Sequence, residues 1–213
     1  MKLQLSMDLI RTPEALKMVE QIHDVIDIVE IGTPMIVREG MVPVMEIRKQ
    51  YPDVVLLADT KIVDGGEIEA ADAFAAGADI VTVLGVAEDE TIRGVVRAAE
   101  KFGGKVLVDL ICVQDIAARA AQLDQMGVDY ICVHTAVDVQ STGRSPYADL
   151  ALLTPVLKQA KTALAGGVKL SAIPLFRHLE PEIVVVGGAL TSRPDIRAAV
   201  LEMQAALGKE QAP

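Results

Sequence analysis

Short runs of apolar residues recur at regular intervals along the chain, and more polar segments separate them. The runs are almost continuously apolar instead of alternating, which is typical of strands buried on both faces of a parallel sheet. Eight such strands are predicted, at residues 3–9, 26–31, 54–58, 80–84, 106–110, 130–133, 162–165 and 183–186.

Segments with helical spacing lie between these strands, and several begin after a capping residue or a proline. The clearest are residues 13–19, 42–49, 66–75, 91–102 and 117–126. The turns Gly77-Ala78-Asp79 and Gly127-Val128-Asp129 look alike and mark the same helix-to-strand junction in two units. Eight such units without a linker favour a closed (β/α)₈ TIM barrel, an α/β fold, over an open doubly wound sheet. We predict a single barrel domain over residues 1–213.

Ionisable residues close several of the predicted strands. The carboxyl ends of all strands in a (β/α)₈ barrel meet at one mouth, where the chemistry of this fold takes place. A single carboxylate at such a junction is usually a helix cap or a turn residue, but several together indicate a site. The residues expected to converge are Asp8, Glu30, Asp59, Lys61, Asp64, Asp109 and His134.

So many carboxylates at one mouth require compensating positive charge, because burying like charges without a cation is costly. Lys61 supplies part of it, and a divalent metal is expected to supply the rest. Glu30 and Asp59 offer hard oxygen ligands, and the chain has no Cys/His ligand spacing. The expected metal is therefore Mg²⁺ and not Zn²⁺.

His134 directly follows a predicted strand, where an imidazole can take or deliver a proton near neutral pH. The other histidines, His23 and His178, lie in polar helical stretches and are expected at the surface. His134 is therefore the candidate acid–base residue.

Glycine pairs end the last two predicted strands, Gly166-Gly167 and Gly187-Gly188. In a barrel, the loops after strands seven and eight commonly bind phosphate through backbone N–H groups. The alternative is that these glycines only permit tight turns. Two pairs at corresponding positions favour a phosphate-bearing substrate.

Composition and charge limit which binding partners and which cellular compartment are expected. The chain carries 20 Lys+Arg against 30 Asp+Glu, a net charge of −10, and only 3% aromatic residues. Nucleic acid is not an expected partner, since phosphates are repelled and stacking side chains are scarce. No apolar segment has the length of a membrane span or of a secretory signal. Cys112 and Cys132 lie in apolar runs and are expected to be reduced core residues of a cytoplasmic protein.

Four segments together resemble the 3-hexulose-6-phosphate synthase family of the orotidine monophosphate decarboxylase superfamily. They are residues 30–34, 58–66, 81–85 and 132–140, and the likeness extends from residue 3 to about residue 194. The Asp-x-Lys-x-x-Asp motif at Asp59, Lys61 and Asp64 is specific for the superfamily. The superfamily also contains a metal-independent nucleotide decarboxylase and a 3-keto-L-gulonate 6-phosphate decarboxylase. The latter resembles this chain but differs at the positions of Asp109, Val137 and Ala189, which favours the synthase.

The resemblance implies a homodimer with Mg²⁺ on Glu30 and Asp59, and with Asp64 reaching into the partner's site. Asp8, Lys61 and Asp109 would contact the substrate, with the four glycines at its phosphate. His134 would remove a proton from C1 of D-ribulose 5-phosphate. The resulting enediolate, stabilised by Mg²⁺, would attack formaldehyde to give D-arabino-hex-3-ulose 6-phosphate.

Two other functions stay open on the sequence alone. A decarboxylase or epimerase acting on another sugar-acid phosphate would use the same enediolate, and Arg144 is a candidate for the extra cation that its carboxylate would need. The segment 140–146 is either a mobile loop over the phosphate or a plain polar connection. A phosphosugar-binding protein without catalysis is the second alternative, but it would be expected to lose some of the strand-end residues. Thr60, between Asp59 and Lys61, departs from the usual family pattern.

Overall fold

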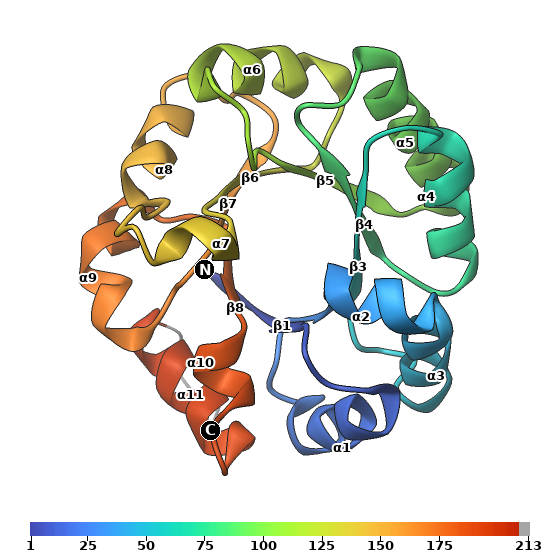
Figure 1. Ribbon diagram of the computed structural model, residues 1–213, viewed down its shortest axis with the longest axis vertical. Helices are drawn as coiled ribbons and strands as arrows, with labels where there is room; N and C mark the ends of the chain where they lie inside the picture. Colours follow the sequence, from blue (N-terminus) through green and yellow to red (C-terminus); the bar gives the residue numbers. More distant parts are fainter. Residues whose placement is uncertain (209–213) are drawn as a thin grey trace.

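The computed structural model describes residues 1–208, and these form a closed parallel barrel. Each strand pairs with the next in the sequence, and the last pairs with the first, as the ring in Figure 1 shows. The strands are β1 (Lys2–Met7), β2 (Ile28–Ile31), β3 (Leu56–Ile62), β4 (Ile80–Leu84), β5 (Lys105–Asp109), β6 (Tyr130–His134), β7 (Lys161–Ala165) and β8 (Ile183–Val186). The predicted (β/α)₈ barrel is confirmed.

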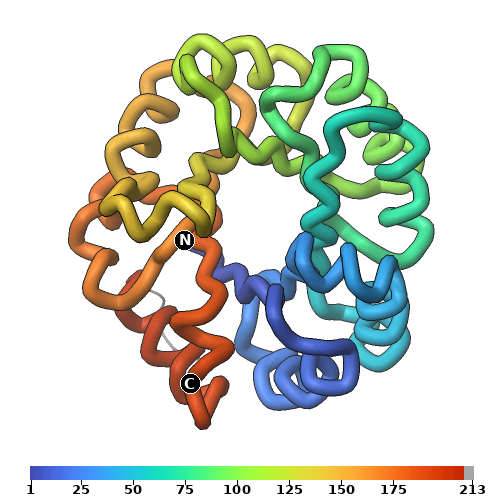
Figure 2. The backbone as a smooth tube through the Cα atoms, viewed as in Figure 1, coloured from blue at the N-terminus to red at the C-terminus, as the bar shows by residue number. Residues whose placement is uncertain are grey.

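Helices enclose this ring on the outside, and the chain in Figure 2 runs once around it until β8 lies beside β1. The helices are α1 (Thr12–Ile22), α2 (Thr33–Glu39), α3 (Val42–Gln50), α4 (Gly66–Ala75), α5 (Asp89–Phe102), α6 (Ile116–Leu123), α7 (Val137–Gln140), α8 (Tyr147–Leu153), α9 (Ile173–Phe176), α10 (Gly188–Thr191) and α11 (Ile196–Ala206). Three short 3₁₀ turns accompany them, at Asp124–Met126, Leu170–Ala172 and Arg177–Leu179. Within residues 1–208, none of these helices is long and apolar enough to cross a membrane.

Two apolar cores explain why the strands are apolar on both faces. The larger lies between the strands and the helices and includes Leu3, Leu5, Val29 and Val81. The smaller fills the barrel interior, because alternate residues of a strand point inward. It is built from Ile28, Leu57, Ile80, Leu107, Tyr130, Cys132, Ala163, Ala165 and Ile183. Because these side chains fill the interior of the barrel, the space for a site lies at its mouth.

The third strand is longer than its apolar run indicates. Its pairing with β4 shifts register between Ala58 and Ile62, and Lys61 has a left-handed φ of 47°. This irregularity keeps the polar residues Asp59, Thr60 and Lys61 inside β3, where the sequence pattern had placed them beyond its end. The kink changes where the side chains of this segment point without breaking the ladder.

The prediction that both cysteines are buried is confirmed for Cys132 and wrong for Cys112. Cys132 is buried in the barrel interior, whereas Cys112 is exposed. Cys112 has a left-handed φ of 64° in the turn that follows β5. The whole apolar run from residue 110 to 113 therefore lies beyond the end of β5, in a turn where this thiol is exposed.

Candidate active site

A cavity of about 670 Å³ opens at the carboxyl ends of the strands. Residues that end strands or follow them line it, and the sequence singled out most of these. They are Asp8, Glu30, Asp59, Lys61, Asp109, His134, Gly166, Gly167, Gly187 and Gly188. The barrel therefore brings together ten of the eleven predicted site residues, from strands far apart in the sequence.

Lys61 lies at the centre of a hydrogen-bonded cluster. Its Nζ is 2.7 Å from Asp59 Oδ2 and 3.1 Å from Asp109 Oδ2. Burial acts to lower the pKa of Lys61, but the charges of Asp59 and Asp109 outweigh it and raise the pKa above its usual range. Lys61 is therefore a fixed positive charge at the bottom of the mouth.

Thr82, from β4, holds the irregular segment of β3 in place. Its hydroxyl donates to Asp59 Oδ1 at 2.8 Å and accepts from the backbone N–H of Lys61 at 2.9 Å. Thr33, at the start of α2, donates to Asp59 Oδ2 at 2.8 Å. These two threonines fix the carboxylate of Asp59, a role that their place in apolar or loop segments did not indicate from the sequence.

His134 is held by Asp109, which is only 3% exposed. The His134 Nδ1 lies 2.8 Å from Asp109 Oδ2, and the other carboxylate oxygen accepts from the backbone N–H of Ile111 at 2.9 Å. Burial acts to raise the pKa of Asp109, but the hydrogen bond and charge of His134, together with Lys61, lower it below its usual range. An ionised Asp109 favours the imidazole tautomer with its proton on Nδ1, which leaves Nε2 free to accept a proton.

Glu30 and Asp59 form the acidic side of the cavity, and each is 6% exposed. Burial and the charge of Asp59 raise the pKa of Glu30 to about 8. Glu30 accepts a hydrogen bond of 2.6 Å from Gln4 Nε2. Lys61 forms an ion pair with Asp59 and not with Glu30, so Glu30 has no ion-pair partner within residues 1–208.

These residues fit Mg²⁺. Gln4 Oε1 is buried without a hydrogen-bond partner, beside Glu30. Mg²⁺ is commonly held by one or two carboxylates and completes its shell with water and substrate oxygens. Within residues 1–208, no group of three or more His, Cys, Asp or Glu side chains is placed to hold a metal. Glu30 and Asp59 are the residues that would hold Mg²⁺.

Asp8 ends β1 and faces the same space. Its carboxylate approaches the backbone so closely that a Cβ added at Gly32 would lie 2.0 Å from Asp8 Oδ1. Burial and the charge of Asp59 raise the pKa of Asp8, while a 3.3 Å hydrogen bond from Ser6 acts against this shift. Gly32, at the turn from β2 into α2, is a site residue that sequence reasoning missed.

The four glycines form a further part of the cavity wall, the glycine wall, in which Gly187 lies beside Asp8. Gly166 has a left-handed φ of 100°, and a Cβ there would lie 2.4 Å from the backbone oxygen of Thr135. The loop after β7 therefore needs glycine to pass this close to β6. Gly188 begins the four-residue helix α10, and no atom lies within 4 Å of an added Cβ. Open space thus faces the backbone at this position, as a bound anion would require.

Two predicted residues lie outside the cavity. Asp64 is exposed in the loop after β3, where its Oδ1 accepts from the N–H of Gly65 at 2.8 Å. Arg144 is exposed and lies 4.0 Å from Asp149. Neither lines the cavity of its own chain.

Comparison with known proteins places this site in a family. Residues 1–203 match the model of the Orotidine 5'-phosphate decarboxylase / HUMPS family. Because this match spans most of the chain, the protein belongs to that family of barrel proteins.

Several similar proteins have a more specific name than that of the whole family. The 3-hexulose-6-phosphate synthase of Bacillus subtilis (strain 168) is 47% identical over 195 residues, covering 92% of this chain and 93% of the relative. The crystal structure of 3-hexulose-6-phosphate synthase from Salmonella typhimurium superposes with a TM-score of 0.93 at 41% identity, covering 97% and 98% of the two chains. The 3-keto-L-gulonate-6-phosphate decarboxylase of Vibrio cholerae O1 biovar El Tor shares the fold at 22% identity, with a TM-score of 0.86 and 97% coverage of each chain.

Proposed function

We propose that this protein is an aldehyde-lyase that condenses formaldehyde with D-ribulose 5-phosphate to D-arabino-hex-3-ulose 6-phosphate. The observation that carries the proposal is the cluster of His134, Asp109 and Lys61, which places an oriented base and a fixed cation at one point of the cavity. A base beside a cation is what an enolisation requires, because a negative charge develops on oxygen as the proton leaves carbon.

In the proposed reaction, His134 Nε2 removes a proton from C1 of D-ribulose 5-phosphate. The electron pair of the broken C–H bond forms a C1–C2 double bond, and the C2 carbonyl oxygen becomes negative. C1 of this enediolate then attacks the carbon of formaldehyde. The C2 carbonyl forms again, and the formaldehyde oxygen takes up a proton, so that no atom is lost.

The other residues of the site bind the substrate and stabilise the negative charge that develops on it. Lys61 donates to the developing negative oxygen, and Asp8 accepts from a hydroxyl of the sugar. Glu30 and Asp59 would hold Mg²⁺, which would supply further positive charge where negative charge develops on the substrate. The backbone N–H groups at Gly166-Gly167 and Gly187-Gly188 bind the phosphate, which contributes binding energy away from the reacting carbon.

The name of the relatives at 41–47% identity supports this reaction. We further propose that the protein works in the cytoplasm as a homodimer, with Asp64 entering the partner's site, and that it binds neither nucleic acid nor membrane.

The test is the consumption of formaldehyde by the purified protein with D-ribulose 5-phosphate, with and without Mg²⁺. His134→Ala is the inactive variant, and His178→Ala, at an exposed position outside the cavity, is its matched control. We expect metal-dependent loss of formaldehyde that falls by a factor of about 10² or more in His134→Ala alone. Unchanged formaldehyde, together with CO₂ release from 3-keto-L-gulonate 6-phosphate, would assign the site to the decarboxylase branch instead.

A further inference from the structure

The cavity is acidic for a site that receives a phosphate ester. Five carboxylates line it, those of Asp8, Glu30, Asp59, Asp109 and Asp138. Among the described lining residues, the positive side chains are Lys61 and Lys169, and His134 is the one other basic group. Any side chain that forms an ion pair with a phosphate dianion in this cavity is therefore one of these three.

Two of these three basic groups, Lys61 and His134, already contact buried carboxylates of the site. Lys61 Nζ contacts Asp59 and Asp109 at 2.7 Å and 3.1 Å, and its charge is offset by them. His134 is held by Asp109 at 2.8 Å. Neither can turn toward the glycine wall without leaving a buried carboxylate unpaired, which is costly. The phosphate end of the cavity thus depends on Lys169.

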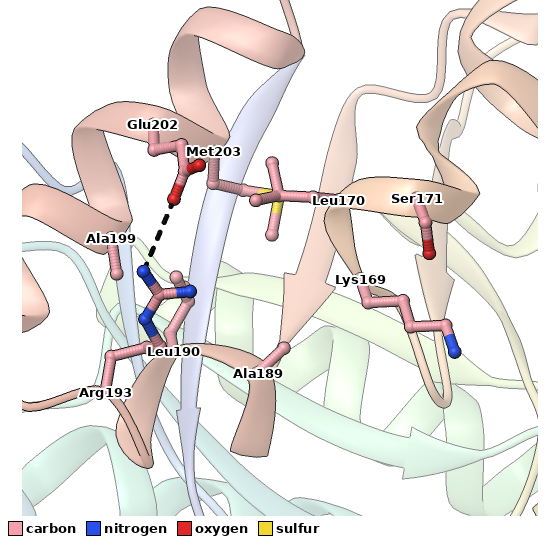
Figure 3. A pocket seen from close by; sticks show the side chains of 9 residues that line it. All are labelled: Lys169, Leu170, Ser171, Ala189, Leu190, Arg193, Ala199, Glu202 and Met203. Carbon is pink, nitrogen blue, oxygen red and sulfur yellow. Dashed lines mark ion pairs between the residues drawn. The ribbon is translucent and has the colours of Figure 1, made fainter.

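Lys169 stands two residues after the Gly166-Gly167 pair, on an extended backbone with φ −147° and ψ 163°. Its side chain is exposed, and within residues 1–208 it forms no ion pair or hydrogen bond. Figure 3 shows the side chain extending away from the neighbouring ion pair of Arg193 and Glu202, whose closest atoms are 3.7 Å apart. The ammonium group is therefore available to a ligand.

The surroundings of Lys169 leave room for an anion beside the glycines. Lys169 and Ala189 both line the main cavity and also a smaller one of about 290 Å³. Ala189 directly follows Gly188 in the sequence. The free lysine and the second glycine pair thus face the same part of the cavity.

We propose that Lys169 is the cation that binds the phosphate group of the substrate, together with the backbone N–H groups of the two glycine pairs. Lys169 acts in binding and takes no part in proton transfer. The identity of the sugar phosphate rests on the proposed function, whereas the preference for a phosphate does not. Removal of the ammonium group is expected to raise the KM for D-ribulose 5-phosphate and to leave kcat nearly unchanged.

The experiment compares Lys169→Met and Lys169→Arg with Lys161→Met. Lys161 is the matched control because it is exposed at the start of β7, the strand whose other end leads into the loop with Lys169. Calorimetry measures the binding of D-ribulose 5-phosphate, of D-ribulose and of inorganic phosphate to each protein, without formaldehyde. We expect Lys169→Met to bind D-ribulose 5-phosphate and inorganic phosphate about tenfold or more weakly, because a charge-assisted hydrogen bond is lost. Lys169→Arg should retain most of the affinity, and Lys161→Met should match the wild type.

The outcomes separate this proposal from the proposed function. Wild-type affinity for both phosphate ligands in Lys169→Met would overturn the role of Lys169, and so would an equal loss of affinity for D-ribulose. If the wild-type protein binds D-ribulose 5-phosphate through Lys169 but consumes no formaldehyde, the aldol reaction fails while the phosphate site stands. Thermal unfolding of each variant checks that the change is not a loss of folded protein.

Discussion

Asp109 connects the base and the cation of the candidate site. One carboxylate oxygen contacts both His134 Nδ1 and Lys61 Nζ, at 2.8 Å and 3.1 Å. A carboxylate in this position fixes the orientation of the imidazole and stabilises the imidazolium that forms when His134 accepts a proton. In the proposed reaction, Asp109 thus takes part in proton transfer through His134 and also lines the cavity.

Asp109→Asn should lower kcat by a factor of about 10² or more, because the amide can present its N–H to Nδ1 and hold the wrong tautomer. The KM for D-ribulose 5-phosphate should change little, since the glycine wall is untouched. Steady-state kinetics check both values, with Asp138→Asn as the control at an exposed position of the same cavity. A kcat close to that of the wild type would contradict the role assigned to Asp109.

Glu30 makes the stability of the metal-free protein depend on pH. Its pKa is about 8 when folded, against an ordinary value of 4.5. Between these values the folded state holds a proton that the unfolded chain has lost, so the free energy of unfolding falls as the pH rises. The slope from this group is at most about 1.4 kcal/mol for each pH unit.

Urea unfolding in EDTA at several values between pH 5 and pH 8 measures this slope. Glu30→Gln should flatten it, because the amide does not titrate. Added Mg²⁺ should raise the Tm of the wild type more at pH 8 than at pH 6, since the metal binds the ionised carboxylate. An unchanged slope in Glu30→Gln would show that other groups cause the dependence.

The sequence predicted the members of this site but not their contacts. Asp8, Glu30, Asp59, Asp109 and His134 each stood out because a polar residue interrupted or ended an apolar run. The contact between Asp109 and His134 depends on the register of β5 against β6, which no local pattern encodes. Gln4, Thr33 and Thr82 gave no signal, because buried polar side chains at single positions resemble ordinary strand and loop residues.

At the scale of elements, α4 and α5 lie unusually close together. A Cβ added at Gly66 would lie 2.0 Å from the backbone oxygen of Thr91, and one at Gly94 would lie 2.9 Å from the backbone nitrogen of Glu67. The two helices therefore meet backbone to backbone at these glycines, and this contact fixes the loops after β3 and β4.

Gly66→Ala should lower the Tm, because the helices must separate or strain at a cost of about 1–3 kcal/mol, more than the gain in helix propensity. Gly188→Ala is the matched control, since no atom lies within 4 Å of the new methyl group and its Tm should stay unchanged. Thermal unfolding followed by circular dichroism compares the two. Equal Tm values would mean that the contact between α4 and α5 adapts without cost.

The elements themselves were largely predictable. The bounds of β4, β8 and α4 agree with the sequence pattern, because each is an uninterrupted apolar or amphipathic run with clear turn residues at its ends. The start of α3 was also predicted, but the preceding helix α2, which ends before Gly40 with its φ of 61°, was not. The extension of β3 through Lys61 was also missed, because polar residues inside a strand contradict the apolar pattern from which strands are inferred.

At the scale of the whole molecule, the position of Asp64 predicts shared active sites. Asp64 is exposed and does not line the cavity of its own chain, although it belongs to the same motif as Asp59 and Lys61. In a twofold dimer, a residue on one subunit can complete the site of the other.

Mixing inactive Asp64→Asn with inactive His134→Ala under conditions of subunit exchange should then restore about a quarter of the wild-type activity. Half of the dimers are hybrids, and each hybrid has one site with both residues intact. Light scattering checks the dimer, and the formaldehyde assay measures the recovery. If Asp64 instead serves its own chain, no site in any hybrid is complete and the mixture stays inactive.

The left-handed backbone of Lys61 lowers the stability of the fold at a residue that the proposed reaction needs. A residue other than glycine in this conformation destabilises the fold by about 1–3 kcal/mol, whereas the free energy of unfolding of a whole domain is only about 5–15 kcal/mol. The barrel carries this local strain because β3 must bend to place the ammonium group between two carboxylates. Selection for thermal stability alone would favour glycine at this position. The resulting proteins would be more stable, but they would lack the ammonium group that the proposed reaction uses.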